Sequence, residues 1–474
     1  MLEGLEITIY KKSNILYDNE EFRLDAEYYQ KQYLELYGHL KNSVILSGIT
    51  EMSDLSSNAS FATVSGIVHD NNPKIIPFIR SGNVGETFIN ETDLELISSE
   101  AHYQLEKSIT KLHDVMMARK GKIGGASIIL EDQVNFNCNE NVIKLTIKNK
   151  EEINPFYFTV YFNSKYGKKQ VERLATGNVQ PWVSIFQIRK LKFRNASTEF
   201  SKLIEQTIIN SYSKLISGKN KMSDSNTELS KLFGVDNWVP TSKNIAIKKI
   251  SQTFLSTGRL DAEYYQPKFD ELIKKINNVK HDTLGNLVVF KKSIEPGSDA
   301  YQTEGIPFVR VSDISKFGIS ETEIHLNRNE FDLDELKPKK DTILLSKDGS
   351  VGIAYKVEED IDVITSSALL HLKLKSKEVL PDYLTLVLNS KLTQMQAERD
   401  AGGSIIQHWR PDEIKQVLIP ILPIDVQKEL TKQIQQSFKL RKESKRLLEV
   451  AKTAVEMAIE VGEDKAIKFI KANS

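Results

Sequence analysis

An internal repeat constrains this chain more than any other feature. The eight residues Arg23-Leu-Asp-Ala-Glu-Tyr-Tyr-Gln30 recur unchanged at positions 259–266, and further matches follow in the same order. A match of this length points to duplication of a large unit rather than to a short-period solenoid. The other paired segments are 7–12 with 245–250, 76–80 with 306–310, 114–124 with 341–352, 163–165 with 389–391, 175–177 with 401–403, and Trp182 with Trp409.

The repeat predicts an α+β fold with two tandem domains of mixed α/β structure and a pseudo-twofold internal repeat. Long helices that pair as an antiparallel coiled coil are expected to separate the two domains. A chain of 474 residues is long enough for two such cores. The predicted parts are an N-terminal segment (1–30), a first domain (31–196), a central helical spacer (197–244), a repeat of the N-terminal segment (245–266), a second domain (267–423) and a C-terminal helical spacer (424–474).

Each copy has the same expected internal order. A short helical segment containing Asp-Ala-Glu-Tyr-Tyr opens the copy. Short apolar runs that end at glycine loops, residues 114–118 and 341–345, are typical of strands. Residues 155–164 and 381–390 begin with a proline suited to a first helical turn and are predicted as helices.

A long helix is expected to close each copy, because apolar residues recur there at steps of three or four. The C-terminal helix is predicted from about residue 425 to 460, roughly 50 Å long, and the first is expected to pause near Gly218. We expect the two apolar stripes to pack on each other, although each helix packing only on its own domain is the alternative. The stripe residues are Phe200, Ile204, Ile208 and Tyr212 in the first helix and Val426, Leu430, Ile434 and Phe438 in the second.

Composition excludes several classes of protein. Lys plus Arg and Asp plus Glu both number 64, which argues against a protein that coats nucleic acid by charge alone but leaves room for local basic patches. The single cysteine, Cys138, excludes a disulfide framework or a cysteine-based zinc site and is expected to be buried. The first ten residues do not resemble a signal peptide, and no apolar run is long enough to span a membrane. A cytoplasmic location is the expectation.

Catalytic motifs are missing from the sequence. It has no Asn/Asp-Pro-Pro-aromatic loop of an adenine methyltransferase, no dinucleotide-binding glycine motif and no phosphate-binding loop of an ATPase. The eight histidines lack metal-ligand spacing, so no metal or cofactor is expected on this chain. Asp400 with Glu413 and Lys415 would be the best nuclease candidate, yet residues 176–190 of the first copy contain no acidic residue.

Glycine loops and basic residues remain as candidates for binding. Residues 120–125 and 347–352 combine glycine with lysine, which suits a backbone that approaches a phosphate closely, although plain hairpin turns would look the same. Residues 165–194 carry eight basic residues and one acidic residue, either a binding patch or a solvated helix face. Trp182 and Trp409 are either core anchors or stacking platforms. The DNA-binding candidates are Arg80, Lys120, Lys122, Lys169, Gln180, Arg310, Lys347, Ser350, Gln407 and His408.

These features together resemble the specificity (S) subunit of type I restriction-modification systems. The resemblance rests on the repeated Arg-Leu-Asp-Ala-Glu-Tyr-Tyr opening, the strand followed by a Gly-x-x-Gly turn, and the segment Leu418-Ile-Pro-Ile-Leu-Pro-Ile-Asp-Val-Gln427 that leads into a helix. The first copy departs from this last pattern, having Leu191-Lys-Phe-Arg-Asn-Ala196 without prolines. The departure affects the position of the boundary there and not the resemblance itself.

The resemblance implies a non-catalytic subunit whose domains 31–196 and 267–423 are target-recognition domains, each reading one half of a bipartite site in double-stranded DNA. It also implies two modification subunits that methylate adenine with S-adenosylmethionine, and restriction subunits that use ATP and Mg²⁺. The alternatives are a stand-alone site-specific nuclease, a structural coiled-coil scaffold, and a specificity subunit of a type IIB-like enzyme. The target sequence, its spacer length and the base-contacting residues cannot be read from one chain.

Overall fold

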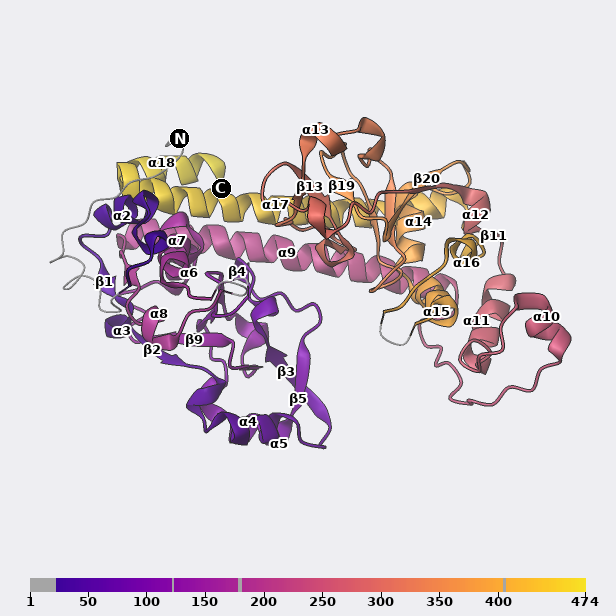
Figure 1. Ribbon diagram of the computed structural model, residues 1–474, viewed down its shortest axis with the longest axis horizontal. Helices are drawn as coiled ribbons and strands as arrows, with labels where there is room; N and C mark the ends of the chain where they lie inside the picture. Colours follow the sequence, from indigo (N-terminus) through magenta and orange to yellow (C-terminus); the bar gives the residue numbers. More distant parts are fainter. Residues whose placement is uncertain (1–22, 122, 178–180, 404–405) are drawn as a thin grey trace. The chain divides into compact units, whose positions relative to one another are not determined.

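The computed structural model describes residues 23–121, 123–177, 181–403 and 406–474, and the chain divides into two compact units (Figure 1). Unit 1 contains the chain up to Leu215 together with residues 442–474, and unit 2 contains residues 216–441. Two long helices, α9 (Thr198–Leu232) and α17 (Ile424–Val461), are each divided between the two units. Each compact unit therefore includes a part of both long helices.

Unit 1 is built around a five-stranded sheet in the order β2-β9-β6-β7-β4. All pairs are antiparallel except β4 with β7. All four residues of β6 are buried, which explains why this strand reads as a continuous apolar run. The strands are β2 (Thr50–Ser53), β4 (Thr87–Phe88), β6 (Val115–Ala118), β7 (Ala126–Ile128) and β9 (Val142–Ile147).

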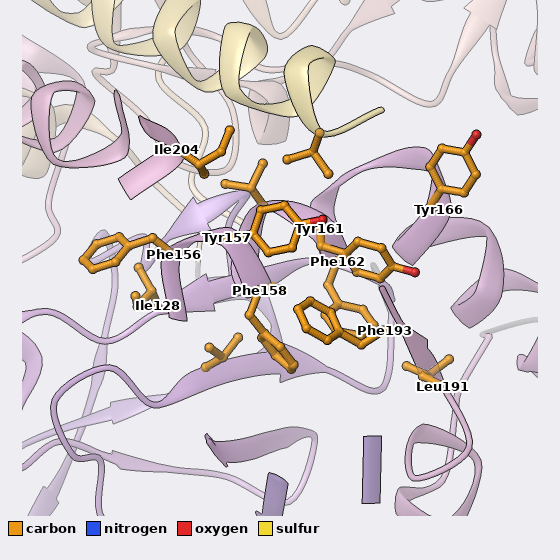
Figure 2. Close-up of a cluster of buried hydrophobic side chains, with 14 of the residues drawn as sticks. Ile128, Phe156, Tyr157, Phe158, Tyr161, Phe162, Tyr166, Leu191, Phe193 and Ile204 are labelled. Carbon is orange, nitrogen blue, oxygen red and sulfur yellow. The ribbon is translucent and has the colours of Figure 1, made fainter. Parts of the chain in front are cut away.

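Helix α6 (Pro155–Asn163) forms the centre of the first core. Asn154 accepts hydrogen bonds from the N–H groups of the first turn, Pro155 stands at the first helical position, and all nine residues are buried. Its aromatic rings pack around Phe193 (Figure 2). The other elements of unit 1 are η1 (Ala26–Tyr29), α2 (Lys31–Gly38), β1 (Val44–Ile45), α3 (Leu46–Ile49), α4 (Phe61–Val68), β3 (Lys74–Ile79), β5 (Glu95–Ser98), α5 (Ser99–Gln104), β8 (Asn137–Cys138), α7 (Lys165–Leu174), α8 (Ile185–Ile188), β10 (Lys192–Phe193) and α18 (Glu463–Asn473).

Unit 2 contains a four-stranded antiparallel sheet in the order β12-β20-β17-β18. Helix α14 (Pro381–Leu388) packs against it, as α6 does in unit 1. The strands of unit 2 are β11 (His281–Thr283), β12 (Val288–Lys292), β13 (Ile306–Val309), β14 (Ile314–Ser315), β15 (Gly318–Ile319), β16 (His325–Leu326), β17 (Ile343–Ser346), β18 (Ala354–Lys356), β19 (Ile364–Thr365), β20 (Leu369–Leu374) and β21 (Leu418–Pro420). Its further helices are α10 (Phe254–Thr257), α11 (Pro267–Asn277), α12 (Leu284–Leu287), α13 (Arg328–Phe331), α15 (Lys391–Asp400) and α16 (Pro411–Lys415).

The same side-chain bond holds the central helix to the sheet in both units. The Asn163 side chain accepts from the N–H of Ala126 at 2.9 Å and donates to its carbonyl at 2.8 Å. Asn389 makes the same two bonds to Ala354, at 3.1 and 2.7 Å. An asparagine at the end of α6 or of α14 thus supplies a hydrogen-bond partner for both backbone groups of one residue in β7 or β18. This role accounts for the repeated asparagine in Asn-Ser-Lys.

The long helices pack against each other in antiparallel directions, as predicted. In unit 2 the hydroxyl of Ser437 donates to the carbonyl of Gly218 at 2.6 Å, and Ser225 contacts Gln433 at 3.4 Å. In unit 1 the buried hydroxyls of Ser211 and Ser444 are 2.9 Å apart. Position numbers thus rise on α9 as they fall on α17. Helix α9 runs unbroken through Gly218, so the expected pause is wrong; this glycine lets the partner helix approach closely.

The two predicted stripes do not pack on each other. Phe200, Ile204 and Ile208 lie in the core of unit 1 with residues 448–459 of α17, whereas Leu430 and Ile434 lie in the core of unit 2 with Met222 and Leu229 of α9. The antiparallel register decides this: each stripe faces the opposite end of the partner helix. The remaining stripe residues contact their own domains, with Tyr212 against Phe88, Phe438 against Tyr355, and Val426 beside the second core.

Within the described residues, no helix combines the length and the apolar character that crossing a membrane requires.

Candidate nucleic-acid interface

In unit 1 the turn after β6 meets a second loop, the one between α7 and α8. The carbonyl of Pro181 accepts a hydrogen bond from the N–H of Gly121 at 3.3 Å, and Lys120 forms an isolated bridge with Trp182. Thr176 and Trp182 exchange two backbone hydrogen bonds, at 3.0 and 2.9 Å. The described ends of the second loop are therefore fixed against the first.

Charge and an aromatic ring stand side by side on this part of unit 1. The guanidinium of Arg119 lies 2.8 Å from the fully buried carboxylate of Asp54 and also donates to the carbonyl of Val183 at 3.2 Å. Lys120 is exposed, and the Trp182 side chain is 43% exposed. An exposed ring beside a lysine provides both a stacking surface and a phosphate partner.

Unit 2 repeats the arrangement with other side chains. Gly349 donates to the carbonyl of Gln407 at 2.9 Å, and Gly402 exchanges two backbone bonds with His408, at 3.1 and 2.7 Å. The ring nitrogen Nδ1 of His408 lies 2.8 Å from a carboxylate oxygen of Asp348. The Lys347 ammonium is also paired with Asp348 and is largely covered. Gln407, His408 and Lys347, predicted separately from the sequence, are thus brought together, with Ser350 exposed on the same turn.

The structural match between the loops differs by one residue from the match read from the sequence. Val183 donates to the carbonyl of Arg119 at 2.9 Å, and Trp409 donates to the carbonyl of Lys347 at 2.8 Å. Lys347 therefore corresponds to Arg119, not to Lys120, and Trp409 corresponds to Val183, not to Trp182.

The one-residue shift arises from the residues that precede β6 and β17. His113 and Asp341 occupy equivalent left-handed positions, with φ of 65° and 63°. The sequence comparison instead matched Asp341 with Asp114 because both are aspartates. In the structure Asp348 and His408 stand where unit 1 has Lys120 and Trp182. The buried Trp409 is a core anchor, whereas Trp182 is exposed.

Arg80 and Arg310 occupy equivalent places directly after β3 and β13. In each case the backbone N–H bonds to the side chain three residues on, Asn83 or Asp313, at 2.9 Å. Both side chains are 43% exposed and both have an acidic neighbour: Glu95 lies 3.5 Å from Arg80 and Asp313 lies 3.7 Å from Arg310. Their described bonds stay within their own turn and strands, so the structure does not join them to the paired loops.

Much of the basic stretch 165–194 is already paired inside unit 1. Lys165 bonds to Glu460 and Lys168 to Glu86, and Arg173 is buried with its guanidinium 4.1 Å from the ring centre of Tyr28. The candidate Lys169 is half-buried and donates to Gln32. The stretch is therefore not one open patch, because several of its charges are paired or buried within unit 1. The candidates Lys122 and Gln180 lie outside the described residues.

The carboxylates considered for a nuclease site are held by arginines. Asp400 is buried, which raises the pKa of its carboxyl although Arg399 lies 2.7 Å away and lowers it. Glu413 lies 3.4 Å from Arg259 and 2.6 Å from Arg410. Across the described parts of the chain, no group of three or more His, Cys, Asp or Glu side chains is placed to hold a metal ion. The buried Cys138 thiol has its pKa raised to about 12 by burial, so it is a core residue, as predicted.

Sequence reasoning missed Arg119 and its buried partner Asp54. The two lie 65 positions apart, and no motif marks either residue. Only the fold brings them together.

The second half of the chain matches a family model described as the type I restriction modification DNA specificity domain, over residues 275–450. The resemblance predicted from the sequence is confirmed over residues 275–450, which match the DNA specificity domain of type I restriction-modification systems. Among curated proteins it is similar to the type I restriction enzyme EcoBI specificity subunit of Escherichia coli, with 25% identity over 147 residues. That match covers 31% of each protein, so the chain spans about a third of the length of this relative.

Two solved structures are similar over most of the chain. One is the S subunit of a type I restriction-modification system from M. genitalium, with 12% identity, a TM-score of 0.35, and coverage of 90% of this chain and 95% of that one. The other is the HsdS subunit from Thermoanaerobacter tengcongensis, with 12% identity, a TM-score of 0.28, and coverage of 91% and 97%.

Proposed function

We propose that this chain is the specificity subunit of a type I restriction-modification complex, and that each unit reads one half of a bipartite DNA site. It acts in the cytoplasm on double-stranded DNA and carries no catalytic site of its own. Two modification subunits supply methyl transfer to adenine from S-adenosylmethionine, and restriction subunits supply cleavage with ATP and Mg²⁺.

One observation carries the proposal: the same pair of loops recurs in both units on the same framework but with different side chains. Lys120 and Trp182 stand in unit 1 where Asp348 and His408 stand in unit 2. A cation beside an aromatic ring suits phosphate contact and stacking. A histidine and a carboxylate instead supply a donor and an acceptor for base edges in the major groove. A constant framework with variable loop chemistry is what reading two different half-sites requires.

The long helices provide the spacing in this proposal. A straight helix advances about 1.5 Å per residue, so about 23 residues match the roughly 34 Å between half-sites one turn of DNA apart. Pairing with a second antiparallel helix stiffens this connection because hydroxyls such as Ser211, Ser444 and Ser437 are buried and bonded along the seam.

The absence of catalysis is supported by the state of the acidic residues. Asp400 and Glu413 are engaged in ion pairs with arginines rather than grouped with other carboxylates. Within the described residues, these ion pairs favour a DNA-reading subunit over a stand-alone nuclease.

Methylome sequencing of a bacterial host that expresses the chain with its modification partner tests the proposal. The expected result is adenine methylation in a motif of two specified halves separated by unspecified bases. Exchange of residues 31–196 for the same region of another specificity subunit should change one half only. A continuous motif, a change in both halves, or methylation or cleavage by the purified chain alone would refute the assignment.

A further inference from the structure

The repeated octapeptide contacts the loop between two helices in the same way in both units. In unit 1 that loop lies between α7 and α8; in unit 2 it lies between α15 and α16. These are the loops that carry Trp182 and His408. The four side chains involved are Arg23, Asp25, Tyr28 and Tyr29 in unit 1 and Arg259, Asp261, Tyr264 and Tyr265 in unit 2, and we call each set the clamp.

In unit 1 the clamp closes the carboxyl end of α7. The guanidinium of Arg23 donates to the carbonyl of Ala175 at 3.0 Å and lies 3.5 Å from those of Arg173 and Leu174. Asp25 holds that guanidinium through two bonds of 2.7 and 2.6 Å, and the hydroxyl of Tyr29 donates to the Arg23 carbonyl. A cation at the last carbonyls of a helix satisfies acceptors that lack partners and opposes the negative end of the helix dipole.

In unit 2 the corresponding side chains bind the end of α15, one carbonyl earlier than the nearest contact in unit 1, because Asp400 corresponds to Leu174. Arg259 donates to the carbonyl of Asp400 at 2.8 Å, Asp261 holds it at 2.9 and 2.6 Å, and the Tyr265 hydroxyl donates to the Arg259 carbonyl at 3.1 Å. The arginine lowers the pKa of the aspartate carboxyl in both clamps, chiefly through the hydrogen bond between them. The two halves of the molecule thus provide two independent observations of one device.

The helix that follows each loop also contacts the region that the clamp binds. In unit 1 the amide of Gln187, in α8, donates to the carbonyl of Leu174 at 2.9 Å. In unit 2 the equivalent residue is Glu413, in α16, which lies 3.4 Å from Arg259. Both residues also accept the backbone N–H at the start of their own helix, from Ser184 and from Arg410. The beginning and the end of each loop are therefore held together at the clamp.

Half of the octapeptide is not needed for this role. Leu24 and Leu260 are 76% and 71% exposed and point away from the core. They provide a control within the motif, because they share its position and lack its bonds.

We propose that the clamp is a positioning device: it fixes the loop ends, and thereby sets where Trp182 and His408 stand against DNA. The inference rests on the proposed function, since it assigns reading to these loops. Removing the arginine leaves the last carbonyls of α7 or α15 without their charged donor. The backbone pair that follows, Thr176 with Trp182 or Gly402 with His408, then opens more often, and base discrimination falls in one half-site only.

The first test needs no DNA. Hydrogen–deuterium exchange of the full-length chain is measured at the amides of Thr176, Trp182, Gly402 and His408. Arg23→Ala should speed exchange at Thr176 and Trp182 by about tenfold or more, the loss expected for a charge-assisted bond, and leave the other two unchanged. Arg259→Ala should do the reverse. Leu24→Ala and Leu260→Ala should change none of them.

The second test uses the same variants on a pool of random duplexes, from which the bound fraction is sequenced. Arg23→Ala should weaken base preference about tenfold in one half of the selected motif, and Arg259→Ala in the other half. Arg23→Lys and Arg259→Lys keep the charge but lose the two-pronged bond to aspartate, so they should restore part of the preference. The untouched half within each molecule serves as an internal control for folding.

The outcomes test the clamp and the proposed function separately. Unchanged exchange at all four amides overturns the clamp, whatever the DNA result. Faster local exchange with intact preference in both halves also overturns it, because these loops are then not the readers. Exchange that rises throughout β6 or β17 indicates unfolding; the lysine variants then decide, and equal preference in lysine and alanine variants overturns the positioning role. If the wild-type chain selects no motif, the proposed function is refuted. The hydrogen–deuterium exchange at the four amides still tests the clamp in that case.

Discussion

Units 1 and 2 keep the same bonds where the loops are held and differ where the loops face outward. The asparagine bonds of α6 and α14 agree to within a few tenths of an ångström, and the clamps at α7 and α15 use the same side chains on neighbouring carbonyls. The exposed pair is Lys120 with Trp182 in one unit and Asp348 with His408 in the other. Positions fixed by the framework are constrained by packing, whereas outward positions are free to differ in charge and shape.

The two sheets also differ at one buried polar position. Lys144 of β9 and His371 of β20 face the corresponding residues Met116 and Leu344 of the neighbouring strands. Lys144 donates to the carbonyl of Ile109 at 2.6 Å, and His371 lies 2.8 Å from the hydroxyl of Thr365. Burial lowers the pKa of both groups, in His371 to about 4. The same fold thus buries a cation in one unit and a neutral imidazole in the other.

The largest effect is expected from changing the helices that join the units. Four residues inserted between Ser217 and Gly218, with four matched residues between Ser437 and Phe438, lengthen both antiparallel helices by about 6 Å and nearly keep their rotation. The methylated motif should keep both halves and gain one or two unspecified base pairs. Two residues at each place rotate the helices by about 200° and should abolish methylation. An unchanged spacer after the four-residue insertions would show that the helices do not set it.

Acid should destabilise unit 2 through His371. The folded-state pKa of about 4 lies below the ordinary value of 6.5, so the unfolded chain binds the proton more readily. Stability from this group is therefore full above pH 6.5 and falls as the pH drops toward 4, by up to about 3 kcal/mol. Amide exchange in β20 should accelerate over this range in the wild type relative to His371→Gln. Equal acid sensitivity of the two proteins would contradict the prediction.

Gly218 should tolerate no large side chain. A Cβ at this position would lie 3.0 Å from Cγ of Arg441 and 3.1 Å from the carbonyl oxygen of Ser437. Gly218→Leu must push the helices apart in unit 2 and should destabilise that unit by about 1–3 kcal/mol. Urea unfolding followed by exchange in unit 2 measures the change. Ser217→Leu, at the exposed neighbouring position, is the control and should cost much less.

The smallest effect is expected at the turns after β6 and β17. Lys120→Ala should weaken binding to all duplexes and reduce the slope of log affinity against log salt by about one. Lys347→Ala should change the slope less, because its ammonium is paired with Asp348 and largely covered. Affinity titrations at several salt concentrations measure both. No change in affinity or slope in the Lys120→Ala, Lys347→Ala double variant would show that neither lysine contacts DNA.

The repeat in the sequence was enough to predict the strands β6 and β17, the helices α6 and α14, and the antiparallel pairing of α9 with α17. These elements have strong local signals: apolar runs, a proline at the first helical position and a helical stripe. The residue-by-residue match between the two copies was wrong where local signals are weak. Asp114 and Asp341 are the same residue type but differ in structural position, which displaced the match of Lys120 and of Trp182 by one residue.

The sequence by itself determined that two similar units exist, where their buried strands and helices lie, and that no catalytic motif accompanies them. Identity of residue type and hydrophobic spacing are properties of short segments, so they can be read along the chain. The tertiary structure alone decided which residues meet across long separations: Arg119 with Asp54, His408 with Asp348, and the octapeptide with the ends of the loops. Hydrogen bonds and ion pairs act over about 3 Å, and only the folded chain brings such distant positions that close.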